Sequence, residues 1–248
     1  APFAEDVVET ISENAELYLP GVAAPANVLT LLDRTLEEFA KRKDRLSSEA
    51  QVVVERRDVL KAINTMSGVP TQLLDDAQKL SIGQVRGFFE SRILGQKDAV
   101  EAVVDLITLI KAGLTNPGKP LGVFLFVGPT GVGKTELVKA MAEYIFASPE
   151  RMFRFDMSEF KDYHAFEKLI GDPRAEETSL RGSGSLLGRV RQAPFSIVLL
   201  DEIEKAHANI FDLLLQVFDD GRLSDAKGTT TSFTQTIIIM TSNLGSQH

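Results

Sequence analysis

Gly128-Pro129-Thr130-Gly131-Val132-Gly133-Lys134-Thr135 matches the phosphate-loop pattern GxxxxGK[ST]. An apolar run at residues 123–127 precedes it, and a helical pattern begins at Lys134. Glycine lets the backbone curl, so that successive N–H groups and the N-terminus of the next helix form an anion cradle. We expect this loop and the adjoining Glu136 to bind the phosphates of ATP or ADP, with Lys134 at the outer phosphates and the Thr135 hydroxyl on Mg²⁺.

Short apolar runs alternate with helical stretches around this loop. The runs lie at 123–127, 153–155, 197–200 and 237–240, and the helical stretches include 134–146 and 208–218. Runs that are apolar at every position are typical of strands buried on both faces, and strands separated by helices pair in parallel. The pattern predicts an α/β fold in which a parallel sheet lies between two layers of helices.

Residues 1–66 are predicted to form a small, mainly helical subdomain. Apolar residues recur at helical spacing over 5–18. The stripe expected in a second helix is Val28, Leu29, Leu32, Leu36 and Phe39. Asp58 is expected to cap a third helix. Ser67-Gly-Val-Pro70 is a predicted joint, so we expect the α/β domain to occupy residues 67–248.

The composition argues against several classes of protein. The 248 residues carry 27 Lys and Arg against 35 Asp and Glu, a net charge of −8, whereas nonspecific binders of nucleic acid or anionic membranes are usually basic. The absence of Cys excludes disulfides, thiolate metal ligands and a Cys nucleophile. No apolar run approaches the roughly 20 residues that cross a bilayer, and the acidic N-terminus does not resemble a signal peptide. We expect a cytoplasmic protein with no nucleic-acid or membrane partner.

Polar residues follow two of the predicted strands. Asp201 and Glu202 come directly after the run at 197–200, and Asn243 follows the run at 237–240. Open α/β sheets bind ligands at the carboxyl ends of their strands. We expect Asp201 to hold Mg²⁺, Glu202 to orient or deprotonate an attacking water, and Asn243 to position that water.

These motifs resemble the AAA+ ATPases, and more narrowly the second ATPase ring of Clp-type unfoldases and disaggregases. The matching segments are SGVP at 67–70, RILGQKDAV at 92–100, FDMSEF at 155–160, LLDEIEKAH at 199–207, DDGRLSDAKG at 219–228 and MTSNLGS at 240–246. Residues 5–35 resemble the end of the first ring's small helical subdomain. The resemblance implies that Lys134 and Thr135 belong to Walker A, Asp201 and Glu202 to Walker B, and Asn243 to sensor 1. It also implies that Ile93 and Leu94 line the adenine pocket.

The chain departs from the family pattern in three places. The family's arginine finger, sensor-2 arginine and C-terminal small subdomain come after sensor 1, so we expect a fragment of a longer chain that hydrolyses ATP weakly. The aromatic pore-loop element is missing from residues 172–185, where Leu180 is the candidate grip on polypeptide. The coiled-coil insertion of disaggregases is missing between Phe39 and Val52, which favours a protease-partner unfoldase or a specialised remodeller.

The resemblance implies a ring, expected to be a hexamer, that unfolds or remodels client proteins with ATP, and it makes a protease a candidate partner. An alternative is a nucleotide-binding assembly or regulatory switch that does not thread polypeptide. The altered loop favours this alternative, whereas Glu202 opposes it because a pure binder needs no base. A nucleic-acid motor or clamp loader shares the phosphate loop, but the acidic charge disfavours it.

Overall fold

The computed structural model describes residues 2–19, 22–45, 52–75, 77–171, 184–225 and 227–244. The chain divides into two compact units, Ala1–Gln78 and Lys79–His248. The division falls later than residue 66, because helix α4 (Thr71–Leu74) contacts helix α3 (Arg56–Ser67) of the first unit. None of the helices in the described part of the chain is long and apolar enough to cross a membrane.

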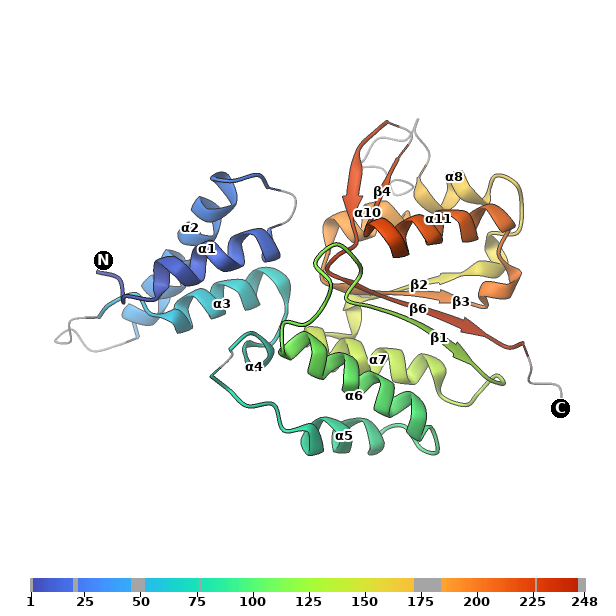
Figure 1. Ribbon diagram of the computed structural model, residues 1–248, viewed down its shortest axis with the longest axis horizontal. Helices are drawn as coiled ribbons and strands as arrows, with labels where there is room; N and C mark the ends of the chain where they lie inside the picture. The colour runs from blue at the N-terminus through green and yellow to red at the C-terminus, as the bar shows by residue number, and fades with distance from the viewer. Residues whose placement is uncertain are drawn as a thin grey trace. The chain divides into compact units, whose positions relative to one another are not determined.

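The first unit is helical, as expected, with α1 (Val7–Tyr18) and α2 (Ala26–Lys43) preceding α3 and α4 (Figure 1). The predicted stripe of α2 is wrong at Leu29, which is 56% exposed. The buried row is instead Asn27, Leu31, Thr35 and Phe39, at intervals of four residues. Polar members fit this row because their side chains bond to the helix backbone, as the Thr35 hydroxyl does to Leu31 O at 2.8 Å.

The third helix begins earlier than predicted. Its N-cap is Glu55, and Asp58 is the third helical residue of a capping box in which the Asp58 carboxylate accepts from Glu55 N at 2.9 Å. Asp58 also accepts from Arg42 Nε at 2.7 Å and Nη2 at 2.6 Å. The carboxylate is therefore committed to an ion pair between α2 and α3, and the expectation that Asp58 is the N-cap is wrong.

The second unit is built on a parallel four-stranded sheet of order β1-β6-β3-β2. Its strands are β1 (Gly122–Val127), β2 (Met152–Asp156), β3 (Ser196–Asp201) and β6 (Thr236–Ser242). Each contains one of the four predicted apolar runs, so the strand predictions are confirmed. Pairing of Val127 with Ser242 and of Asp156 with Asp201 brings four strand ends to one edge of the sheet.

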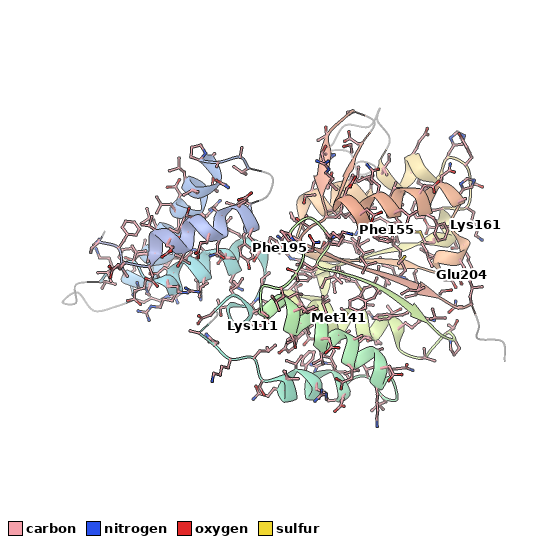
Figure 2. All side chains as sticks on the ribbon, viewed as in Figure 1. Lys111, Met141, Phe155, Lys161, Phe195 and Glu204 are labelled. Atoms are coloured by element: carbon pink, nitrogen blue, oxygen red, sulfur yellow. The ribbon has the colours of Figure 1, made fainter. Side chains whose placement is uncertain are left out.

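Helices cover both faces of this sheet, as expected for three layers (Figure 1). The helices on one side are α5 (Ile82–Glu90), α6 (Lys97–Lys111) and α7 (Lys134–Phe146), and those on the other are α8 (Ala165–Ile170), α10 (Leu186–Gln192) and α11 (Ala208–Asp220). Short 3-10 turns are η1 (Pro149–Arg151), η2 (Met157–Glu159) and η3 (Ile203–Lys205). Met141 of α7 and Phe155 of β2 lie on opposite sides of the sheet (Figure 2).

Two features of this unit were not predicted. An antiparallel hairpin, β4 (Arg222–Ser224) with β5 (Thr230–Ser232), follows α11. On β1, Val123, Leu125 and Val127 are 39–58% exposed, so within the described residues β1 is covered on one face only and not on both. The candidate grip on polypeptide, Leu180 with its neighbours at 172–183, lies outside the described residues.

Candidate functional site

The phosphate loop joins β1 to α7 at the edge where the strands end. Gly128 N donates to Ser242 O at 3.1 Å, which ties the start of the loop to the end of β6. Gly131 and Gly133 have φ of +86° and +95°, a region that favours glycine. A Cβ built on either glycine meets no heavy atom within 4 Å, so the space beside both glycines is open. The loop therefore has the backbone form and the room of an anion cradle.

Lys134 is the first residue of α7, and its ammonium turns back into the loop. Lys134 Nζ donates to Gly128 O, to Pro129 O at 3.2 Å, to Ser242 O at 3.4 Å and to Asn243 Oδ1 at 2.8 Å. All four acceptors are uncharged. A phosphate group entering the loop would offer this ammonium a negatively charged acceptor, and so add a Coulombic attraction that the uncharged oxygens do not provide.

Asn243 links the loop to the acidic residues at the end of β3. Its Nδ2 donates to Glu202 Oε1 at 3.1 Å while its Oδ1 accepts from Lys134. Its backbone N–H donates to Glu204 Oε1 at 3.2 Å. The structure thus joins the three residues expected to carry catalysis through direct contacts, although they are far apart in sequence.

Glu202 has φ of +57° and ψ of +51°, a left-handed conformation that is uncommon for a residue with a side chain. Such strained residues cluster at functional sites. The second oxygen, Oε2, accepts from Lys205 Nζ at 2.5 Å. This hydrogen bond raises the pKa of Lys205. Glu202 is therefore held on one oxygen by an amide and on the other by a cation.

Asp201 is held by two neighbouring strands. The hydroxyl of Thr241 on β6 donates to Asp201 Oδ1 and accepts from Glu202 N at 3.1 Å. Arg154 on β2 donates from Nε at 2.9 Å and from Nη2 at 2.6 Å, both to Asp201 Oδ2. The Asp201 side chain is only 13% exposed, so both of its oxygens are engaged in a largely enclosed setting.

The Glu204 carboxylate accepts a hydrogen bond from the backbone at the end of β6. Burial by itself raises the pKa of Glu204, but hydrogen bonds from the backbone N–H groups of Glu204 and Asn243 outweigh it and lower the pKa. Glu204 Oε2 is buried with no hydrogen-bond partner among the described residues. An ionised Glu204 therefore holds the backbone of Asn243 at the end of β6.

The donors expected for Mg²⁺ are of the right chemical kind. Thr135 supplies a hydroxyl and Asp201 a carboxylate, and hard oxygen ligands of this type suit Mg²⁺. The remaining loop residues, Thr130, Val132 and Glu136, lie at the loop and the first turn of α7, where Glu136 pairs with Lys139 at 2.7 Å. The residues present therefore fit a magnesium nucleotide.

Ile93 and Leu94 are the two residues expected at the adenine. Among the described residues, no contact joins either of them to the phosphate loop. Ile93 is buried at 6% exposure and Leu94 is 84% exposed. They lie in the connection between α5 and α6, which is at the same end of the sheet as the loop (Figure 1). Arg92 beside them forms an ion pair with Glu143 of α7 at 3.4 Å. Their role at adenine stays a prediction.

The phosphate loop and the polar strand ends belong to a known protein family. A model of the family described as AAA domain (Cdc48 subfamily) matches residues 119–248, which include the loop, Asp201, Glu202 and Asn243. The chain belongs to this family. The matched residues lie within the second unit, Lys79–His248, and we refer to them as the AAA domain.

Relatives of the AAA domain include chaperones. "Chaperone protein ClpB" of Lactococcus lactis subsp. cremoris is 45% identical over 215 residues, 87% of this chain and 24% of that protein. "Chaperone protein ClpB 1" of Synechocystis sp. is 46% identical over 224 residues, 89% and 25% of the two chains. "Chaperone protein ClpB3, chloroplastic" of Arabidopsis thaliana is 41% identical over 223 residues, 88% and 23%. The chain spans about a quarter of the length of these relatives.

Solved structures agree with this assignment. A closed state of Hsp104 with ATPγS and FITC casein superposes with a TM-score of 0.81 at 32% identity, over 98% of this chain and 41% of that one. The S. cerevisiae Hsp104–ADP complex gives a TM-score of 0.77 at 33% identity, over 99% and 41%. The resemblance to Clp-type proteins is confirmed along nearly the whole chain.

Sequence reasoning missed four residues of the site: Arg154, Lys205, Glu204 and Thr241. A signal existed for Arg154, which is a lone cation between Phe153 and Phe155 in an apolar run. Thr241 lies two residues before Asn243, in the same polar stretch after the apolar run. Lys205 and Glu204 give no such signal, because their contacts depend on the turn η3 after the strand.

Proposed function

We propose that the AAA domain binds Mg·ATP and hydrolyses it, as the motor module of a Clp-like protein-remodelling chaperone. The observation that carries this proposal is the double contact of Asn243, with Lys134 on one side and Glu202 on the other. A group that touches both the phosphate-binding ammonium and a carboxylate base is placed to couple the presence of a phosphate to the activation of water.

The residues of this chain have separate tasks in such a reaction. The N–H groups of the loop bind and orient the phosphates, and Lys134 exchanges its carbonyl acceptors for phosphate oxygens. Thr135 and Asp201 would hold Mg²⁺, which neutralises charge on the phosphates. Glu202 accepts the proton of the attacking water, and Asn243 keeps the Glu202 carboxylate turned toward the loop.

The output proposed for this hydrolysis is unfolding or remodelling of protein clients by a ring of subunits, expected to be a hexamer. The name of the ClpB relatives supports a chaperone role. A protease partner and a cytoplasmic location stay predictions, and one relative is named as chloroplastic. The competing function is a nucleotide switch that does not thread polypeptide, which the absence of an aromatic residue from 172–185 favours.

The test measures ATP turnover under three conditions: with neither polymer added, with a permanently unfolded protein, and with single-stranded DNA. We expect unfolded protein, and not DNA, to raise turnover, and Leu180→Ala to remove that stimulation. Lys134→Ala should abolish nucleotide binding, whereas Lys139→Ala, on the same helix but paired at the surface with Glu136, should keep it. ATP turnover that changes neither with unfolded protein nor with Leu180→Ala would support the nucleotide switch instead.

A further inference from the structure

The Asp201 carboxylate, which is expected to hold Mg²⁺, already forms an ion pair with Arg154. Arg154 approaches Asp201 from the neighbouring strand β2, with Nε at 2.9 Å and Nη2 at 2.6 Å from Asp201 Oδ2. Arg154 pairs in the sheet with Leu199, and Asp156 pairs with Asp201, so Arg154 and Asp201 share one face of the sheet. A guanidinium in this place offers Asp201 a positive charge of the kind that a magnesium ion would bring.

Asp201 does not need Arg154 to keep its position. The Thr241 hydroxyl donates to Asp201 Oδ1 and is itself fixed by Glu202 N, so the carboxylate is anchored from β6. Strand β3, which carries Asp201, lies between β6 and β2 in the sheet. Arg154 thus adds charge to a carboxylate that is already oriented.

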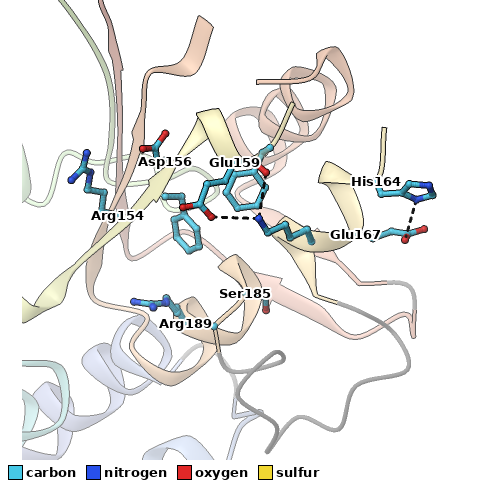
Figure 3. A pocket seen from close by; sticks show the side chains of 11 residues that line it. Arg154, Asp156, Glu159, His164, Glu167, Ser185 and Arg189 are labelled. Atoms are coloured by element: carbon cyan, nitrogen blue, oxygen red, sulfur yellow. Dashed lines mark hydrogen bonds and ion pairs between the residues drawn. The ribbon is translucent and has the colours of Figure 1, made fainter. Parts of the chain in front are cut away.

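The Arg154 side chain also has an alternative position, away from Asp201. Its side chain is 53% exposed, on the strand at the end of the sheet order, whereas that of Asp201 is 13% exposed. Asp156 lies two residues further along β2 on the same face. A pocket of about 680 Å³ adjoins this strand, with Arg154, Asp156, Glu159, Lys168, Ser185 and Arg189 among its lining residues (Figure 3). The guanidinium can therefore leave Asp201 without losing access to water or to a carboxylate.

We propose that Arg154 and Mg²⁺ compete for Asp201, so that Arg154 is a positioning residue that sets the Mg²⁺ concentration at which the nucleotide complex forms. The proposal rests on the proposed function, since it presumes a magnesium nucleotide in the loop. Without nucleotide, Arg154 neutralises Asp201. When the metal binds, Arg154 is displaced toward Asp156 and solvent, and this displacement weakens metal binding.

The experiment is a Mg²⁺ titration of the 248-residue chain at a fixed concentration of a fluorescent ADP analogue, read as nucleotide binding. Arg154→Gln should lower the Mg²⁺ midpoint by about 3- to 10-fold, because a half-exposed ion pair no longer competes. Arg189→Gln is the matched control. It removes the same charge from the same pocket, but its guanidinium lies over the Phe153 and Phe155 rings, so its midpoint should stay unchanged.

A midpoint for Arg154→Gln that is unchanged or higher overturns the competition, because it means that Arg154 assists the metal or does not affect it. If Arg154→Gln does not fold, Arg154→Lys replaces it, and its shorter side chain with a single charged nitrogen should lower the midpoint in the same direction by a smaller factor. Failure of the unsubstituted chain to bind the analogue at any Mg²⁺ concentration overturns the proposed function itself, which separates the two failures.

Discussion

The side-chain amide of Asn243 donates to Glu202 Oε1 at 3.1 Å, across the ends of the adjacent strands β6 and β3. The other side of the same amide accepts from Lys134 Nζ at 2.8 Å. An amide has a donor side and an acceptor side, so these two contacts together fix its orientation. Any movement of the Lys134 ammonium toward a phosphate therefore changes the environment of Glu202.

Replacing Asn243 by Ala should lower ATP turnover by about 10- to 100-fold, because Glu202 loses the contact that turns it toward the loop. Nucleotide affinity should change by no more than about threefold, since the loop and Lys134 remain. Turnover and equilibrium binding of a fluorescent ADP measure the two effects separately. A loss of affinity as large as the loss of turnover would assign Asn243 to binding.

Replacing Gly133 by Ala should destabilise the chain by about 1–2 kcal/mol and abolish nucleotide binding. The destabilisation comes from the backbone, at φ +95°, since a Cβ there meets no neighbour within 4 Å. A shift of the backbone out of this conformation would also displace the loop N–H groups that are expected to bind the phosphates. Urea unfolding and nucleotide binding provide the two readouts.

The control for this substitution is Gly87→Ala, on the exposed side of α5 and likewise with no neighbour within 4 Å. Its backbone is helical, so the change should stabilise the chain by up to about 1 kcal/mol and leave binding unchanged. Equal behaviour of the two variants would mean that the left-handed loop geometry has no role.

In the first unit, Arg42→Met should destabilise by about 3 kcal/mol, because it leaves the Asp58 carboxylate, 3% exposed, without its cation. Arg34→Met, which breaks a half-exposed pair with Glu37, should cost less than about 1 kcal/mol. Hydrogen exchange at the α2 and α3 amides separates these outcomes. Similar exchange in both variants would show that the Asp58 pair contributes no more than a surface pair.

The β4–β5 hairpin should lose the ion pair between Arg191 and Asp225 at acidic pH. Burial by itself raises the pKa of Asp225, but hydrogen bonds from Arg191 and from the Thr229 and Lys227 N–H groups outweigh it and lower the pKa below the ordinary 3.8. A lowered carboxylate pKa stabilises the fold above about pH 3.8, and this stabilisation is lost as pH falls through the folded value.

Asp225→Asn should therefore be less stable than the unsubstituted chain by about 1–2 kcal/mol at pH 7, and the two should converge as pH falls below 3.8. Urea unfolding of both chains from pH 7 to pH 3 measures the difference. A difference that stays constant over this range would exclude a contribution from the ionised Asp225.

Local patterns predicted the parts of the molecule that depend on neighbours in sequence. The four apolar runs became strands, and helix α7 has the expected bounds, Lys134–Phe146. The face of α2 was wrong at Leu29 because polar residues such as Thr35 bond to their own helix and can be buried. The hairpin was missed because its strands have only three residues each.

The residues of the site likewise fall into those that sequence motifs indicate and those that only the sheet brings together. Lys134, Thr135, Asp201, Glu202 and Asn243 belong to contiguous motifs, so the sequence alone indicated them. Arg154 and Thr241 reach Asp201 from two other strands, and these contacts depend on strand order and register. Neither quantity can be derived from the spacing of residues along one chain.

ATP hydrolysis with Glu202 as base is tested by a single-turnover measurement with labelled ATP and protein in excess. We expect the unsubstituted chain and the Glu167→Gln variant to convert bound ATP to ADP, since Glu167 is an exposed carboxylate on α8. Glu202→Gln should bind ATP equally well and convert it at least about 100-fold more slowly. Conversion by Glu202→Gln at the unsubstituted rate, or intact ATP on all three chains, would contradict the account.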